Sequence, residues 1–371
     1  HKKSAIFTDM GSGKTKVIID TIQNNDFGLV LIVGTKKSCD VWEKEFQVHS
    51  ELSNCVNNLV NLSTLKKVTF LKEKAVESQN FTSLCVIIVN YDSVWREPFN
   101  SLLLEYKIDC IICDESHRLK SPSGKASRFL YRLGKNVDRK YILSGTPTSE
   151  SPLDIYGQYR FLDDTIFGTN YNKFRDLYTN IDQRRSAFCG FPVLDKKQPY
   201  KNLDELKAKI YSCAFHITSE IKLPDVRHVF IDSYLSKQAQ KIYKEIEKEG
   251  VYEDNIGVLE TNNILAKYTR LQQLLCGFIP LETENFTNIE QIEKDNSKIE
   301  QLQEILENID YNEKVVVFCK FRKDFEKIQN LCKKLKRSYG EISGKRDDYN
   351  KWKQDKVNVI AVHYNSGSEA R

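Results

Sequence analysis

The stretch DMGSGKT, residues 9–15, has the composition of a loop that holds phosphate groups. A short apolar run, residues 5–7, precedes it, and the segment 16–22 (KVIIDTI) has a helical pattern. In a glycine-rich loop between a strand and a helix, consecutive backbone N–H groups point at an anion. The helix adds the positive end of its dipole to the same anion. The placement of this stretch therefore predicts a nucleotide-binding loop.

The match to the phosphate-loop pattern G-x-x-x-x-G-K-[ST] is incomplete. Gly13, Lys14 and Thr15 match its end, but Thr8 stands at the first glycine position and Gly11 lies inside the loop. We expect Lys14 to reach the β- and γ-phosphates, as a catalytic residue, and the hydroxyl of Thr15 to hold Mg²⁺. The predicted nucleotide-binding residues are Gly11, Ser12, Gly13, Lys14 and Thr15.

Two carboxylates that this chemistry needs follow another apolar run. The run ends at Asp114 and Glu115, in IDCIICDESH. Ligands bind at the carboxyl ends of strands in open α/β sheets. We predict that Asp114 holds Mg²⁺ and that Glu115 orients and deprotonates the attacking water. An acidic strand end that only caps the next turn is the alternative, and the phosphate loop upstream favours catalysis.

Short apolar runs alternate with helical patterns through the first 145 residues. They are continuous rather than alternating, which is typical of parallel strands buried on both faces. Cys110 and Cys113 lie three residues apart on one run, so they point to opposite faces and favour packing over metal binding. The runs are residues 5–7, 28–33, 85–89, 108–113 and 141–143.

The remaining sequence predicts a helical protrusion and a second, incomplete α/β block. We expect one parallel-sheet lobe over residues 1–221, with aromatic-rich helices at about 150–220. An extended run at 226–231 opens a second lobe, 222–371. Lys-, Glu- and Leu-rich sequence from 236 to 306 indicates a long helical region, placed as an insertion at about 236–294. Strand-like runs return at 314–319, 339–342 and 357–362.

Composition restricts the class of protein. The 371 residues, 40% hydrophobic and 29% charged, are ordinary for a globular protein and long enough for two domains. No apolar run is long enough to span a bilayer, and the N-terminus does not have the pattern of a secretory signal. Ten scattered cysteines favour a reducing compartment, the cytoplasm or, in a eukaryote, the nucleus. The net charge of +5 is compatible with a polyanionic partner.

Several motifs, in the right order, resemble those of superfamily 2 helicases, and most closely the Swi/Snf-like ATPases with their phage and bacterial relatives. DMGSGKT, DESH and SGT (144–146) resemble motifs I, II and III. LIVGTKKSCDVWEKEF resembles motif Ia and VIIVNYDSV motif Ib. The segments LSGTPTSESPLDIYGQYRFL and EKVVVFCKFRKDFEKI are also similar to family elements. The resemblance covers nearly the whole chain.

The resemblance implies a motor with two RecA-like lobes that clamp ATP and step along a nucleic acid, usually double-stranded DNA. It implies that His117, Ser144 and Thr146 couple the ATP site to the nucleic acid. The nucleic-acid contacts that it implies are Thr35, Lys36, Asn90, Tyr91, Ser366 and Gly367. The basic loop at residues 118–128, directly after the acidic motif, favours further contacts at Arg118 and Lys120, and a flexible solvated loop is the alternative. No membrane partner is expected. Protein partners, or further domains outside this chain, are compatible with such a motor.

The family's motif VI, with its arginine, and the adenine-reading segment before motif I are missing from the sequence. We therefore expect the chain as given to bind ATP weakly and to hydrolyse it poorly. Two other functions stay open: a helicase that separates DNA or RNA strands, and a nucleotide-gated DNA clamp with little hydrolysis.

Overall fold

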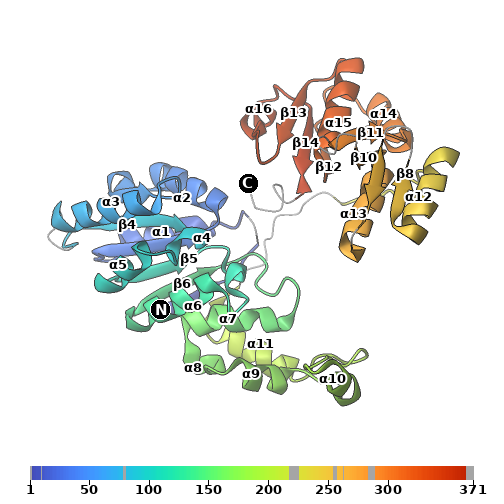
Figure 1. Ribbon diagram of the computed structural model, residues 1–371. Helices are drawn as coiled ribbons and strands as arrows, with labels where there is room; N and C mark the ends of the chain where they lie inside the picture. Colours follow the sequence, from blue (N-terminus) through green and yellow to red (C-terminus); the bar gives the residue numbers. More distant parts are fainter. Residues whose placement is uncertain are drawn as a thin grey trace. The chain divides into compact units, whose positions relative to one another are not determined.

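The computed structural model describes residues 2–9, 11–77, 81–216, 225–253, 257–261, 263–282 and 289–364. The chain divides into two compact units, a first unit His1–Leu223 and a second unit Pro224–Arg371 (Figure 1). Each contains a parallel sheet with helices packed on it, which confirms the predicted α/β class. The predicted lobe boundary at 221/222 lies outside the described residues and stays a prediction. In the described part of the chain, no helix combines the length and the apolar character needed to cross a bilayer.

The first unit is built on one seven-stranded sheet in which every pair is parallel. Its order is β3-β4-β2-β5-β6-β1-β7. Five strands fall on the predicted runs, whereas β3 and β7, of three and two residues, are too short for a periodic signal. The strands are β1 (Lys3–Ile6), β2 (Leu29–Gly34), β3 (Val56–Asn58), β4 (Cys85–Asn90), β5 (Cys110–Cys113), β6 (Arg139–Leu143) and β7 (Ala214–Phe215). Because all run the same way, their carboxyl ends share one edge of the sheet.

Helices cover both faces of this sheet, and two separate hydrophobic clusters result. Cys110 lies in the cluster under α1 (Lys14–Gln23) and α2 (Lys36–His49). Cys113 lies in the other cluster, with α5 (Phe99–Glu105) and α6 (Lys125–Leu133). The prediction that these two cysteines pack on opposite faces is confirmed.

Helices between Ile155 and Tyr211 form a protrusion, and its aromatic residues form its core. Tyr156 lies 4.9 Å from Phe174, and Phe174 lies 5.0 Å from Tyr178, between ring centroids. All three side chains are buried, so they pack the helices rather than form a stacking platform for bases. Figure 1 shows α10 at the far end of the protrusion. The helices are α7 (Ile155–Leu162), α8 (Asp164–Phe167), α9 (Tyr171–Tyr178), α10 (Gln183–Cys189) and α11 (Leu203–Tyr211).

The second unit contains a three-stranded parallel sheet in the order β12-β14-β13. These strands correspond to the three runs expected near the end of the chain. One hydrophobic cluster joins the sheet to two helices. The elements are β12 (Val315–Cys319), β13 (Tyr339–Ile342), β14 (Val359–His363), α14 (Ser297–Asn308) and α15 (Arg322–Lys334).

The predicted long helical insertion at 236–294 is wrong in part. It contains α12 (Lys237–Glu249) and α13 (Ile264–Leu275), but also a four-stranded antiparallel sheet, β11-β10-β9-β8. Gly250 and Gly277, with φ of 74° and 87°, follow the two helices, where a glycine readily takes the left-handed conformation. Strands of three to five residues carry little period-2 signal in Lys- and Glu-rich sequence. They are β8 (Val251–Glu253), β9 (Val258–Glu260), β10 (Phe278–Glu282) and β11 (Ile289–Glu293).

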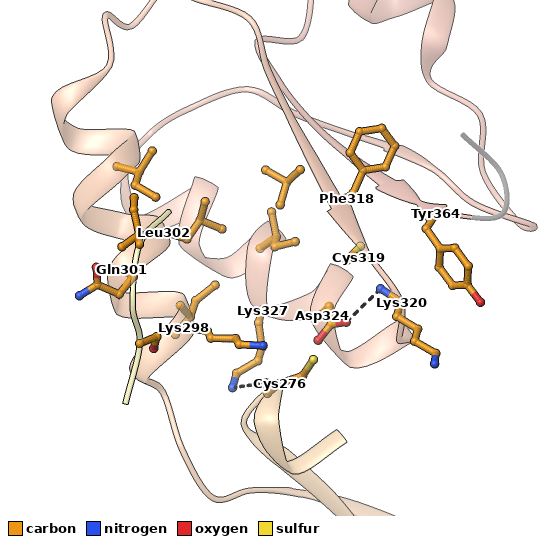
Figure 2. A pocket seen from close by; sticks show the side chains of 16 residues that line it. Cys276, Lys298, Gln301, Leu302, Phe318, Cys319, Lys320, Asp324, Lys327 and Tyr364 are labelled. Carbon is orange, nitrogen blue, oxygen red and sulfur yellow. Dashed lines mark hydrogen bonds between the residues drawn. The ribbon is translucent and has the colours of Figure 1, made fainter. Parts of the chain in front are cut away.

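A cavity of about 610 Å³ lies in the second unit between α14, β12 and α15 (Figure 2). Leu302, Val317 and Phe318 contribute to a largely apolar wall. At one end Asp324 accepts a 3.3 Å hydrogen bond from the backbone N–H of Lys320. None of the predicted site residues within the described part of the chain lines this cavity.

Candidate active site

The loop between β1 and α1 has the geometry of an anion cradle. Gly11 and Gly13 have φ of 76° and 82°, which side chains with a Cβ rarely adopt. A Cβ at either position would meet no atom within 4 Å, so the loop borders open space. The hydroxyls of Thr8 and Ser12 lie 2.5 Å apart and tie the two ends of the loop together. Thr8 thus stabilises the loop from the position where the pattern has glycine.

The first turn of α1 is left free to bind an anion. Gly13 is its N-cap residue, and no described side chain caps it. The first N–H groups of an α-helix have no partner inside the helix, so those of Lys14 and Thr15 can donate to phosphate oxygens. The loop and the helix therefore fit the triphosphate of a nucleotide.

Lys14 spans the mouth of this loop. Its Nζ donates hydrogen bonds of 2.7 Å to the carbonyl oxygen of Thr8 and 2.8 Å to that of Asp9. Burial lowers the pKa of Lys14, and the charges of Glu115 and Asp114 oppose that shift. The lysine and both carboxylates therefore lie within electrostatic reach of one another.

Asp114 follows β5 and is held on several sides. Its Oδ2 accepts a 2.9 Å hydrogen bond from Nε1 of Trp42, and its Oδ1 accepts one of 2.9 Å from the backbone N–H of Glu115. The hydroxyl of Tyr91 donates to the carbonyl oxygen of Asp114 at 2.7 Å. Burial raises the pKa of Asp114, and the bond from Trp42 opposes that shift. The carboxylate is thus fixed in orientation at the sheet edge.

Glu115 and the three predicted coupling residues form one connected group. Glu115 has φ of 48°, an uncommon value for a residue with a side chain. Nδ1 of His117 lies 3.3 Å from Oε2 of Glu115 and 3.3 Å from Oγ of Ser144. Oγ of Ser144 also accepts a 3.1 Å hydrogen bond from the backbone N–H of Thr146. The loops after β5 and β6 are therefore joined through side chains.

Gln158 of α7 forms a second link between these loops, which the sequence did not predict. Its Oε1 accepts a 2.7 Å hydrogen bond from the hydroxyl of Ser116, and its Nε2 donates to the carbonyl oxygens of Pro147 at 2.6 Å and Asp154 at 3.1 Å. Gln158 is fully buried. One signal existed: a glutamine within an otherwise largely apolar and aromatic helix needs buried partners.

Trp42 was also missed as a site residue. It lies in α2, and only 1% of it is exposed. Its partner Asp114 is 72 residues away. No local pattern relates the two, although a buried tryptophan usually finds a partner for its N–H.

The predicted nucleic-acid contacts at the carboxyl ends of β2 and β4 differ in exposure. Lys36 is exposed, whereas Thr35 is buried and accepts the Ser38 N–H to cap α2. Tyr91 is buried with its hydroxyl on Asp114, so its side chain supports the acidic loop. Asn90 is partly exposed at the end of β4.

The other predicted contacts lie after β5 or near the C-terminus. Arg118 is exposed in the short helix η2 (Ser116–Leu119). Lys120, just after it, pairs with Glu150 at 2.5 Å. Ser366 and Gly367 lie outside the described residues.

The two residues predicted to bind Mg²⁺ carry suitable oxygen donors. Thr15 and Asp114 offer the oxygen ligands that Mg²⁺ prefers, and phosphates and water complete such sites. Among the described residues there is no group of three or more His, Cys, Asp or Glu side chains that could hold a metal. A magnesium site of the nucleotide-dependent kind needs no such group, so the residues fit it.

A parallel sheet with a glycine loop after β1 and an acidic pair after β5 defines a P-loop protein of the RecA-like type. Comparison with known families agrees and is more specific. The chain belongs to the SNF2-related domain family, whose family model matches residues 2–316.

Individual relatives are distant. A protein named p41 from Acyrthosiphon pisum secondary endosymbiont phage 1 is 25% identical, over 98% of this chain and 77% of its own length. A DNA repair and recombination protein RAD54-like from Drosophila pseudoobscura pseudoobscura is 22% identical, over 85% of this chain and 43% of its own. This chain therefore spans less than half of the RAD54-like protein. A solved Sulfolobus solfataricus SWI2/SNF2 ATPase core in complex with dsDNA aligns with a TM-score of 0.46 at 18% identity, over 98% of this chain and 74% of that one.

Proposed function

We propose that this protein is an ATP-driven motor that moves along double-stranded DNA. The proposal is supported by Lys14 following β1, and Asp114 and Glu115 following β5, at the same edge of one parallel sheet and within electrostatic reach of one another. Membership of the SNF2-related domain family supports an ATPase. The name of the RAD54-like relative, a DNA repair and recombination protein, supports DNA as the track.

In the proposed reaction the loop amides and Lys14 bind the β- and γ-phosphates of ATP. Thr15 and Asp114 would hold Mg²⁺, which when bound neutralises phosphate charge. Glu115 accepts a proton from the attacking water, and its fixed backbone and the nearby His117 keep its carboxylate in place. Trp42 orients the carboxylate of Asp114.

Coupling to DNA is assigned to the linked loops after β5 and β6. His117 contacts both Glu115 and Ser144, so a change at the γ-phosphate shifts the loop that carries Thr146. The proposed contacts to DNA phosphates are Lys36, Asn90, Arg118 and Lys120, with Thr35 and Tyr91 in supporting positions and Ser366 and Gly367 as further contacts.

The decisive measurement is the ATPase rate with double-stranded DNA, single-stranded DNA and RNA, for the wild type and for Lys14→Ala. We expect stimulation by double-stranded DNA above the other two. Loss of a phosphate-binding cation typically lowers kcat by about 10²–10³-fold, so Lys14→Ala should approach the background rate. Equal ATPase rates for the wild type and Lys14→Ala would contradict the assignment of Lys14 to the ATP-binding site.

Two further assays separate the motor from its alternatives. Displacement of a triplex strand without separation of a duplex is the expected result, and duplex separation would indicate a helicase. In single-turnover experiments, DNA binding that depends on ATP without appreciable hydrolysis would indicate a clamp.

A further inference from the structure

The first unit also contains a cavity, of about 710 Å³, which lies between the loop after η2 and the beginning of α9. Three of its lining side chains are cationic, Lys120, Arg128 and Arg160, and one is a carboxylate, Asp154. The excess of positive charge selects an anionic ligand. We call this cavity the basic pocket.

Arg160 is positioned in the basic pocket with hydrogen-bonding capacity left over. Its guanidinium lies 4.3 Å from the ring centroid of Tyr131, and its Nη1 donates a 3.1 Å bond to the carbonyl oxygen of Pro122. Its Nε is buried without a hydrogen-bond partner in the described part of the chain. The guanidinium has five N–H donors, so groups other than the buried Nε can donate to an anion in the pocket.

The other charges leave room for an anion. The side chain of Arg128 is exposed and makes no hydrogen bond or ion pair with any described residue. Lys120 pairs with Glu150, whose side chain is 73% exposed, and exposed pairs of this kind are weak. Asp154 already accepts hydrogen bonds from the backbone N–H groups of Glu150 and Ser151, at 3.1 and 3.2 Å.

The walls of the basic pocket are held rigidly. A Cβ on Gly157 of α7 would lie 1.9 Å from the carbonyl oxygen of Leu119, so the helix and the loop pack without room for a side chain. On the other wall, Asn170 caps the first turn of α9 through the N–H groups of Asn172 and Lys173. The positive end of the α9 dipole therefore adds to the pocket's charge.

We propose that the basic pocket binds a backbone phosphate of the nucleic acid, which extends the contact assigned above to Lys120 by the side chains of Arg128 and Arg160. The proposal rests on the proposed function, because a phosphodiester is the anion that a DNA motor meets. The pocket is open and partly lined by exposed groups, which suits a phosphate within a long chain. Lys120 directly follows η2, which begins one residue after Glu115, so one short helix joins this contact to the catalytic loop.

The test compares Arg128→Ala with Arg132→Ala. Arg132 is also exposed, lies one turn further along α6 and does not line the pocket, so both variants lose the same charge from the same helix. Binding of a fluorescent 30-base-pair duplex is measured from about 50 to 200 mM salt, together with thermal unfolding. We use Arg128 rather than Arg160 because Arg160 also packs on Tyr131.

A direct phosphate contact predicts that Arg128→Ala weakens duplex binding about tenfold and reduces the slope of log K against log salt by about 0.9. Arg132→Ala should weaken it less than about twofold. An equal loss of duplex affinity in both variants, or no loss in Arg128→Ala, would contradict phosphate binding in the basic pocket. Neither result would contradict the proposed motor function. A wild type that binds no duplex would instead overturn the proposed function.

Inorganic phosphate at matched ionic strength distinguishes the source of the anion. For a DNA contact, millimolar phosphate should not displace the duplex more than chloride does. Displacement by phosphate that disappears in Arg128→Ala would assign the pocket to a small phosphorylated ligand and overturn the proposal.

Discussion

The indole Nε1 of Trp42 donates a 2.9 Å hydrogen bond to Oδ2 of Asp114, across 72 residues of sequence. Trp42 lies in α2, after β2, and Asp114 follows β5, so the pairing of these two neighbouring strands brings them together. The proposed magnesium ligand is thus oriented by a side chain that belongs to a different motif.

The first prediction concerns this bond. Trp42→Phe keeps a ring in the buried position but removes the donor, so the carboxylate of Asp114 is no longer fixed. Loss of such an outer partner typically costs about 10–100-fold in metal affinity or activity. We expect the Mg²⁺ concentration for half-maximal ATPase rate to rise by at least about tenfold. Trp95→Phe, in a partly exposed tryptophan away from Asp114, is the control. An unchanged Mg²⁺ requirement would show that the bond is only structural.

Gln158 carries the second prediction. Gln158→Leu leaves the hydroxyl of Ser116 and the carbonyl oxygen of Pro147 buried without their partner, at a cost of about 1–3 kcal/mol in the free energy of unfolding. If the bond also links the two loops, the ratio of DNA-stimulated to basal ATPase rates should fall several-fold. Ser116→Ala removes the same bond and should lower that ratio in parallel. A stability loss with an unchanged ratio in both variants would reduce Gln158 to a packing role.

Asn90 depends on a buried lysine, which is the basis of the third prediction. Nζ of Lys67 donates a 2.8 Å hydrogen bond to the hydroxyl of Ser93, which donates in turn to Oδ1 of Asn90 at 2.5 Å. This arrangement turns the amide nitrogen of Asn90 away from Ser93 and leaves it available for a phosphate. Lys67 is only 2% exposed, so it positions Asn90 rather than touching DNA.

Lys67→Met should therefore weaken duplex binding about fivefold, for roughly 1 kcal/mol of lost orientation, without changing the salt slope. Lys66→Met, next to it and exposed, removes the same charge and should have less effect on affinity. A salt slope that falls by about one unit in Lys67→Met would mean that Lys67 itself meets a phosphate.

The fourth prediction concerns pH and the buried Lys140 of β6. Burial lowers the pKa of Lys140 from its ordinary value of 10.5 to about 8. At pH values between about 8 and 10.5 the unfolded chain holds the proton and the folded chain does not, so the free energy of unfolding rises with pH. Below about pH 8 both chains hold the proton, and burial of the charged lysine lowers the free energy of unfolding. The charged groups that act on it are Lys3, Asp163 and Asp164.

Lys140→Met should raise the free energy of unfolding at pH 7 by roughly 1–3 kcal/mol, since the charged form is no longer buried. The difference between the variant and the wild type, from urea unfolding at several pH values, should shrink between about pH 8 and 10. A difference that does not depend on pH would contradict the assignment. Lys135→Met, on an exposed side chain, should show neither effect.

The sequence by itself determined the local parts of this protein. The phosphate loop could be predicted because its residues, 11–15, are contiguous, and their geometry depends on the residues beside them. The main strands could be predicted because strands buried on both faces are continuously apolar, as Val30 and Ile32 of β2 are.

Only the tertiary structure decided the partners of those parts. The sheet order places β6 between β1 and β5, and so brings His117 to Ser144 and the acidic pair towards Lys14. The hydrogen bond from Trp42 reaches Asp114, 72 residues away, and the one from Ser116 reaches Gln158, 42 residues away. No periodic pattern in the sequence predicts contacts over such separations. The short strands of 251–293 escaped prediction for the same reason, because pairing with distant neighbours stabilises them more than their own propensity does.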